Sequence, residues 1–180
     1  MEGILASAGI KNGNGRYYSE KIWKREIDKY MDSVKQNRAV GELDHPESTV
    51  INLKNVCHNI IDIWWDGNNI MGKIEILPTP SGNILQALIG SGITVGVSSR
   101  GMGSVRQMGE ILEVQDDFEL LCWDFVSTPS NPGSWMTPIN VHGDVTVNLN
   151  ENLNTRTKDY SKANEIIREI LCAHGSCPIF

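Results

Sequence analysis

The sequence predicts an α+β domain with a mixed or antiparallel β-barrel at its core. Many short β-rich runs are bounded by turn-forming residues, and only two helical patterns lie between them. Strands and helices do not alternate regularly, as they do in a doubly wound parallel sheet. With 180 residues and 40% apolar content, the chain is long enough to bury one interior. We therefore expect one domain at residues 1–140, followed by a polar tail at 141–180.

The first predicted elements are a strand and a helix. Residues 2–11 alternate loosely and then meet Asn12-Gly13-Asn14-Gly15, whose residue types accept the positive φ angles of turns. Ser19 can cap a helix at about 19–36. An apolar stripe at three- and four-residue spacing supports this helix: Trp23, Ile27, Tyr30 or Met31, and Val34.

Two hairpins are predicted later in the chain. Residues 59–65 and 70–77 are rich in β-forming side chains and flank an Asp-Gly turn signal. Residues 110–114 and 118–126 form a second such pair around Asp116-Asp117.

A short helix and a strand are expected between these hairpins. Ser81 follows Pro80 and is placed to cap the helix, which ends near Gly90. The compact apolar run at 93–97 predicts a strand that delivers Ser98 and Ser99 to its end.

Composition argues against several classes of partner. The net charge is −6 and no basic cluster occurs, which disfavours nucleic acid and anionic membranes. The first residues do not resemble a signal peptide, and no run of about 20 apolar residues exists, so a soluble cytoplasmic protein without membrane contact is expected. The cysteines form no C-x-x-C pair, and we expect reduced thiols at Cys57, Cys122, Cys172 and Cys177.

Three residues from separate segments form a candidate nucleophilic site. His45 lies on a predicted loop, and its near-neutral pKa suits proton transfer. Ser98 lies in Gly96-Val97-Ser98-Ser99-Arg100-Gly101, where glycines on both sides let the backbone approach a substrate. With Asp124 they supply a base, a nucleophile and an orienting acid, as in serine hydrolases.

Each of the first two residues also has a plain structural interpretation. A loop histidine such as His45 is an ordinary surface residue. The serine motif is G-x-S-S-x-G rather than the G-x-S-x-G of a nucleophile elbow, and no helix pattern follows it. An α/β-hydrolase is thus disfavoured, and Ser98 and Ser99 can equally belong to a small-residue turn without chemistry.

Asp124 is the strongest residue-level indication of a site. Both faces of its predicted strand are apolar, so water reaches neither face easily. An unpaired carboxylate there would cost roughly several kcal/mol and therefore requires a partner. A histidine N–H is one candidate, and Arg100 or Arg106 is the structural alternative.

Taken together, several blocks of the sequence resemble the prohead core proteases of contractile-tailed bacteriophages. The similarity spans roughly residues 2–138 and includes the Asn-x-Asn-x-Arg-x-Tyr element at 12–18. Four further blocks carry it in the same order: Gly41-Glu42-Leu43-Asp44-His45-Pro46, Trp64-Trp65-Asp66-Gly67-Asn68-Asn69, Gly96 to Ser104, and Trp135-Met136-Thr137-Pro138.

The resemblance implies a serine endopeptidase with a mainly antiparallel β-barrel surrounded by helices, similar to the herpesvirus assemblin. It implies that His45 is the base, Ser98 the nucleophile and Asp124 the third member of the triad. The amides of Ser99 to Gly101 are expected near the oxyanion, with Ser99, Arg100 and Gly101 contributing to oxyanion or substrate binding. Arg100 and Arg106 are candidates to bind a substrate carboxylate, although Arg100 can equally pair with Asp124.

The family also implies partners and a location. Such enzymes cleave scaffold or core proteins and the major capsid protein inside the immature head, in the host cytoplasm, after glutamate in Leu-x-Glu or Ile-x-Glu sequences. They then cleave themselves. No metal or cofactor is needed, and we expect a homo-oligomer. The rival hypotheses are an inactive structural or core component of the virion with the same barrel, and a cellular peptidase or esterase.

The polar tail contains two sequences of the cleaved type. Residues 148–154 are rich in asparagine, and a short helix is predicted near 160–172. Leu149-Asn150-Glu151 and Ile167-Arg168-Glu169 match Leu/Ile-x-Glu. We therefore expect self-cleavage after Glu151, and also after Glu169.

Overall fold

The computed structural model describes residues 1–139. The predicted helix near 160–172 and both tail sequences lie outside the described residues. Within them the chain is mostly strands with two helices, which confirms the α+β class. The elements are β1 Glu2–Ser7, β2 Arg16–Tyr17, α1 Glu20–Lys35, β3 Val40–Glu42, β4 Val56–Asp66, β5 Asn69–Ile76, α2 Pro80–Gly90, β6 Gly96–Met102, β7 Val105–Met108, β8 Ile111–Val114, β9 Glu119–Val126 and β10 Met136–Thr137.

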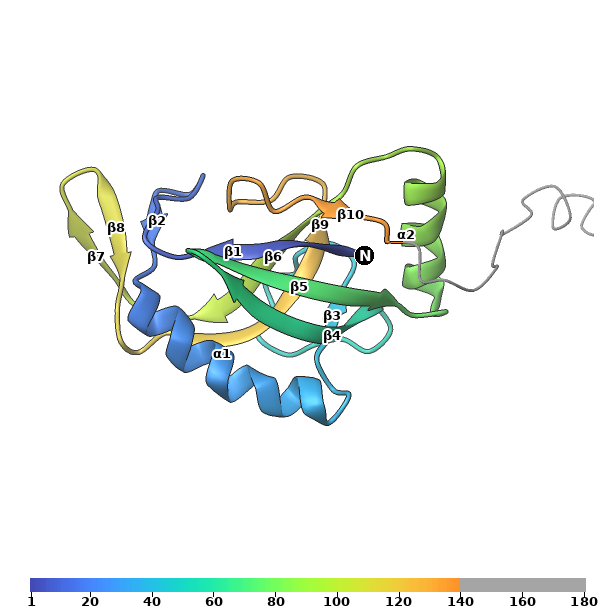
Figure 1. Ribbon diagram of the computed structural model, residues 1–180, viewed down its shortest axis with the longest axis horizontal. Helices are drawn as coiled ribbons and strands as arrows, with labels where there is room; N and C mark the ends of the chain where they lie inside the picture. The colour runs from blue at the N-terminus through green and yellow to red at the C-terminus, as the bar shows by residue number, and fades with distance from the viewer. Residues whose placement is uncertain (140–180) are drawn as a thin grey trace, which may run out of the picture. The chain divides into compact units, whose positions relative to one another are not determined.

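The strands of residues 1–139 form three sheets rather than one closed barrel. Their orders are β10-β1-β5-β4-β3, β2-β8-β7 and β6-β9. Isolated bridges such as Leu43–Phe125 and Gly96–Trp135 join the β6-β9 pair to its surroundings. No continuous hydrogen-bonded ladder closes a barrel within the described residues, so the barrel part of the fold prediction is not confirmed. Figure 1 shows α2 and the β7-β8 hairpin at opposite ends of the large sheet.

Helix α1 was predicted nearly residue for residue. The Ser19 hydroxyl accepts a hydrogen bond from the Ile22 N–H at 3.3 Å and so caps the helix. Trp23, Ile27 and Tyr30 of the apolar stripe are buried, whereas Val34 is half-buried. Trp23 stacks on Trp123 of β9 with ring centroids 6.1 Å apart. Glu26, also buried, accepts a hydrogen bond from the Leu120 N–H at 2.9 Å. The helix therefore fixes β9, the strand that carries Asp124.

The first hairpin is confirmed, whereas the cap of the second helix differs from the prediction. Strands β4 and β5 pair around Gly67, which has φ +57°. Helix α2 is capped by Thr79, whose hydroxyl accepts from the Gly82 N–H at 3.0 Å. Pro80 occupies the first helical turn, where its fixed φ and missing N–H cost nothing, so the cap lies before Pro80 rather than at Ser81.

None of the helices described in residues 1–139 is long and apolar enough to cross a membrane.

The predicted hairpin of residues 110–114 and 118–126 is wrong. Strand β8 pairs with β7 across a turn at Gly109, which has φ +60°, while β9 pairs with β6. Strand β7 is exposed along its length. Strand β9 is apolar on both faces and lies in the interior, so burial separates two runs that are neighbours in sequence.

His58 on β4 makes the fold sensitive to acid. Its side chain is fully buried against Phe125, with ring centroids 4.9 Å apart. Burial lowers the pKa of His58 to about 4, although nearby Asp124 and a backbone contact raise it slightly. The unfolded chain therefore binds a proton near pH 6.5 that the folded chain refuses until about pH 4. Stability should fall as the pH decreases through this window.

We expect wild type to lose about 3 kcal/mol of unfolding free energy between pH 7 and pH 4 through His58. The variant His58→Gln should lose that much less over the same interval, because it has no imidazole to protonate. Urea unfolding at pH 7, 5.5 and 4 measures both slopes. Parallel slopes for the two proteins would assign the acid sensitivity to other groups.

Candidate active site

His45 and Asp124 are in contact. His45 Nδ1 lies 2.9 Å from Asp124 Oδ2, and the Asp124 side chain is fully buried. The chain reaches this position because Leu43 bridges to Phe125, and the Asp44 N–H donates to the Phe125 carbonyl at 2.8 Å. Asp44 adopts φ +70°, which turns the backbone before His45. The loop after β3 is therefore fastened to β9 immediately beside the histidine.

A second partner of Asp124 is Arg100, on the neighbouring strand β6. Its Nε lies 3.0 Å from Asp124 Oδ2, and its terminal NH2 group donates to Asp124 Oδ1 at 3.1 Å. The same NH2 group donates to the buried carboxylate of Glu42 at 2.8 Å. Both partners foreseen for Asp124, a histidine and Arg100, are thus present together.

Charge and burial act against each other in this cluster. Burial alone would raise the pKa of Asp124, but His45, the Glu42 amide and Arg100 together hold that pKa below its usual range. Burial disfavours the Arg100 cation, yet Glu42 and Asp124 raise the pKa of Arg100. Burial also raises the pKa of Cys122 to about 12, so its thiol stays protonated beside them. Asp124 is therefore ionised at neutral pH.

The two contacts of Asp124 Oδ2 are short, but neither N–H group is aligned with this oxygen as a hydrogen bond requires. Both His45 Nδ1 and Arg100 Nε lie within ion-pair distance of this oxygen. Neither meets the angular requirement of a hydrogen bond. The two donors nevertheless compensate the charge of this oxygen at these separations, and the pKa of Asp124 lies below its usual range accordingly.

Ser98 lies opposite Asp124 in the β6-β9 ladder. Directly opposed residues of an antiparallel pair point to the same face of the sheet. Ser98 Oγ lies 3.2 Å from Ser130 Oγ, and this is its side-chain hydrogen bond within residues 1–139. The serine is in the middle of β6, not at a strand end as predicted.

His45 and Ser98 line the same pocket, which has a volume of about 340 Å³. Ser99 lines it as well, together with Arg16, Tyr18 and Ser130. The structure thus brings the three predicted residues together. His45 contacts Asp124, Ser98 lies opposite Asp124 in the sheet, and His45 and Ser98 line the same pocket. His45 and Ser98 make no hydrogen bond with each other among the described residues.

The arginines predicted to bind substrate are occupied elsewhere. Arg100 is 5% exposed and held by Glu42 and Asp124, while Arg106 pairs with Glu113 at 2.8 Å on the exposed β7-β8 hairpin. Neither lines the pocket. Gly101 does not line it either, and a side chain there would clash with the ring of Phe118 at 2.6 Å. These contacts do not favour substrate binding by the side chains of Arg100 and Arg106 or by Gly101.

Several residues of the site were not foreseen. Glu42 was not predicted to take part in the site, yet it is a buried partner of Arg100. Ser130 lies on a loop fastened by Asn131, whose Oδ1 accepts from the Ser7 N–H at 3.0 Å. Arg16 had no signal beyond its place in the early Asn-x-Asn-x-Arg-x-Tyr element.

Comparisons with known proteins identify the family of this chain. The family model described as prohead core protein serine protease matches residues 1–146. The prohead core protein protease of Enterobacteria phage T4 is 34% identical over 143 residues, covering 77% of this chain and 68% of the relative. The solved structure of the bacteriophage T4 capsid assembly protease matches with a TM-score of 0.67 and 30% identity, covering 69% of this chain and 79% of that chain. The assemblin-like barrel is not established by these matches. On the extent of the family match and the identity with the T4 relative, this chain belongs to the prohead core protein serine protease family.

Proposed function

We propose that this prohead core protease is a serine endopeptidase with Ser98 as nucleophile, His45 as base and Asp124 as orienting acid. The observation that carries the proposal is the 2.9 Å contact between His45 Nδ1 and Asp124 Oδ2 in a structure where His45 and Ser98 share one pocket. We propose scaffold, core and major capsid proteins as its substrates, cleaved inside the immature head.

The geometry suggests how the proton moves. With Nδ1 held 2.9 Å from Asp124 Oδ2, the imidazole keeps Nε2 for the proton of Ser98. Glu42 and Asp124 supply two carboxylates against the single guanidinium of Arg100. An imidazolium at His45 would bring this cluster to balance, so the cluster stabilises the charge that forms as Ser98 attacks.

The backbone of β6 offers a donor for the oxyanion. The Val97 N–H donates to the Ser134 carbonyl at 2.9 Å and so points away from β9. Amides alternate along a strand, which places the Ser99 N–H on that same edge. No further strand pairs with β6 within residues 1–139. We assign the Ser99 amide to the oxyanion hole.

Ser130 holds the nucleophile at rest. Its hydroxyl lies 3.2 Å from Ser98 Oγ, whereas attack needs Ser98 to bond His45. A rotation of the serine about its side-chain bond replaces one partner by the other. Binding of substrate in the shared pocket is the step that would drive this exchange.

We propose that Arg16 recognises the glutamate before the scissile bond. It lines the pocket with His45 and Ser98, and it forms no ion pair within residues 1–139. Burial raises the pKa of Tyr18, which also lines the pocket, and the nearby Arg16 guanidinium lowers it in part. A guanidinium beside a pocket is suited to pair with a carboxylate.

Arg16→Gln is expected to reduce kcat/KM for a glutamate peptide by about 10- to 100-fold, because a charge-assisted contact is lost. The reduction for the matching glutamine peptide should be less than about threefold. Arg38→Gln, the same change at an exposed arginine outside the pocket, is the control. Equal losses for both peptides would remove Arg16 from the recognition of glutamate.

The proposed function is tested first by cleavage of a scaffold-type peptide containing Leu-x-Glu beside its Leu-x-Gln counterpart.

We also propose self-processing after Glu151, with Glu169 as a second site. Incubated wild type should then lose its C-terminal segment, and intact mass spectrometry should show a new end at one of these residues. An uncut peptide and an unchanged mass after prolonged incubation would favour the rival hypothesis of an inactive virion component.

A further inference from the structure

One residue of the early Asn-x-Asn-x-Arg-x-Tyr element supports the pocket of Ser98 without lining it. Gly13, Asn14 and Arg16 come from a single turn and all line this pocket. Asn12, the first residue of the element, does not line it. Its side chain is half-buried and is bonded to the backbone of the turn. Asn12 therefore belongs to the support of the pocket wall.

The side-chain oxygen of Asn12 holds the turn closed. Asn12 Oδ1 accepts a hydrogen bond from the Asn14 N–H at 3.0 Å and another from the Arg16 N–H at 2.9 Å. The Asn12 N–H donates to the Arg16 carbonyl at 2.9 Å. An Asx turn needs only a bond to the backbone two residues further on. The two additional bonds fasten Arg16 at both its N–H and its carbonyl.

The turn as a whole is fixed to the rest of the domain at two points. The Leu112 N–H, on β8, donates to the Gly15 carbonyl at 2.8 Å. The Gly13 N–H donates to the Ser130 carbonyl at 2.7 Å. These contacts place the turn, and Asn12 fixes its last residue.

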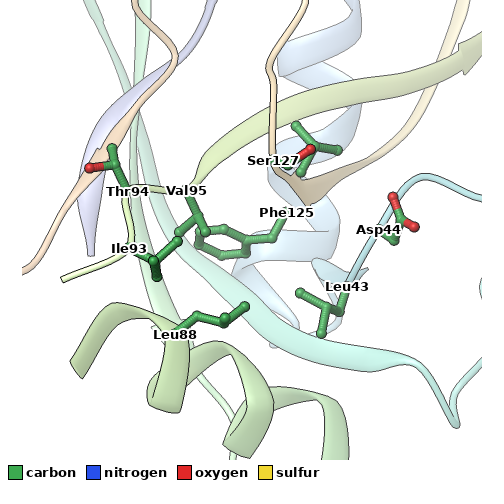
Figure 2. A pocket seen from close by; sticks show the side chains of 9 residues that line it. Leu43, Asp44, Leu88, Ile93, Thr94, Val95, Phe125 and Ser127 are labelled. Carbon is green, nitrogen blue, oxygen red and sulfur yellow. The ribbon is translucent and has the colours of Figure 1, made fainter. Parts of the chain in front are cut away.

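Arg16 is the permanent cation in the lining of this pocket. The neighbouring pocket, which shares Val126 with it, has no cationic side chain in its wall. Figure 2 shows aliphatic side chains gathered around the ring of Phe125 there, with the carboxylate of Asp44 at the rim. A carboxylate of the substrate would be repelled on that side. Its binding therefore depends on where Arg16 is held.

We propose that Asn12 is a positioning residue for substrate binding, which acts by holding Arg16 at the pocket before the substrate arrives. The proposal rests on the proposed function, in which Arg16 pairs with a carboxylate of the substrate. A segment that must become ordered during binding reduces the affinity by the free energy of that ordering. Because Asn12 fixes the backbone of Arg16 in advance, this loss of affinity is avoided.

The test is a double-mutant cycle of Asn12→Ala and Arg16→Gln, built in Ser98→Ala so that no peptide is consumed. The Kd is measured for the Leu-x-Glu peptide. Asn12→Ala alone should weaken binding by about 5- to 20-fold. In the Arg16→Gln background the same change should weaken binding by less than about twofold, because the guanidinium that Asn12 positions is then absent.

A second measurement uses the protein with Ser98 intact. Asn12→Ala should lower kcat/KM by a similar factor and change kcat by less than about threefold. The expected split follows from the separate support of the nucleophile. The loop that carries Ser130 is fastened by Asn131, whose Oδ1 accepts from the Ser7 N–H at 3.0 Å.

Asn68→Ala is the matched control, because Asn68 is an exposed asparagine in the turn between β4 and β5 and does not line the pocket. It should leave the Kd unchanged. Urea unfolding checks that Asn12→Ala is folded under the assay conditions. We expect it to be folded, because Asn14 and Arg16 are exposed and their freed N–H groups can bond water.

Three results would overturn the proposal. Equal weakening by Asn12→Ala in both backgrounds would show that Asn12 does not act through Arg16. An unchanged Kd in Asn12→Ala would show that it does not act on binding. An unchanged Kd in Arg16→Gln alone would remove the assignment of Arg16 and the positioning role with it. Absence of cleavage in wild type, with the cycle behaving as expected, would count against the proposed chemistry and not against the role of Asn12.

Discussion

Ser98→Ala is expected to reduce peptide cleavage by roughly 10⁴- to 10⁶-fold in kcat, because it removes the atom that forms the covalent bond. The fold should persist, since the substitution deletes one hydroxyl whose side-chain partner in residues 1–139 is Ser130. A discontinuous assay on the Leu-x-Glu peptide, read by mass spectrometry, has the range to measure this loss. Urea unfolding of the same sample checks that stability is within about 1 kcal/mol of wild type.

Two neighbouring hydroxyls provide the controls. Ser99 and Ser130 line the same pocket as Ser98. Ser99→Ala keeps the amide assigned to the oxyanion, and Ser130→Ala removes only the resting partner of the nucleophile. Each should retain activity within about tenfold of wild type. Full activity in Ser98→Ala with loss in either control would move the nucleophile to that residue.

Local sequence signals were sufficient where an element is stabilised by its own residues. Helix α1 has its cap at Ser19 and its apolar stripe within one continuous segment, so both its start and its buried face were predictable. The β4-β5 hairpin is joined by a turn at Gly67, which fixes the register of the strands on either side.

The pairing of strands that are distant in sequence could not be predicted from such local signals. Strand β8 has turn-forming residues on both sides, and nothing local distinguishes β7 from β9 as its partner. The two-sided apolar pattern of β9 indicated burial but not that β6 would lie beside it. The barrel was predicted from many strands without regular helix alternation and from the family resemblance, whereas closure depends on ladders between strands far apart in sequence.

The residues of the site also divide into those that local sequence signals predict and those that depend on how distant strands pack. The need of Asp124 for a partner followed from its apolar strand, and both candidates, His45 and Arg100, are present in the structure. That one arginine would also hold Glu42 depends on β3 and β6 approaching the same strand. Arg16 reaches the pocket through the packing of a loop, which leaves no periodic signal in the sequence.

Arg100→Met is expected to destabilise the fold by about 3–5 kcal/mol at pH 7, the cost of leaving a buried charge without its partner. Methionine keeps much of the side-chain length, so the packing loss is small by comparison. Asp124 and Glu42, both fully buried, would lose the guanidinium that contacts each of them. Urea unfolding measures the change, and Arg106→Met, at an exposed pair, should alter stability by less than about 1 kcal/mol.

The pH dependence separates an unpaired charge from a packing defect. In wild type, Arg100 helps to hold the pKa of Asp124 below its usual range, so this carboxylate favours folding above that range. Without the guanidinium the pKa of Asp124 rises, and the folded state takes up a proton more readily than before. The destabilisation by Arg100→Met should therefore shrink as the pH falls from 7 towards 4. A packing defect would cost the same at every pH, and a constant difference would refute the electrostatic role of Arg100. Adding Glu42→Gln should recover part of the loss at pH 7, because one of the two stranded carboxylates is then neutral.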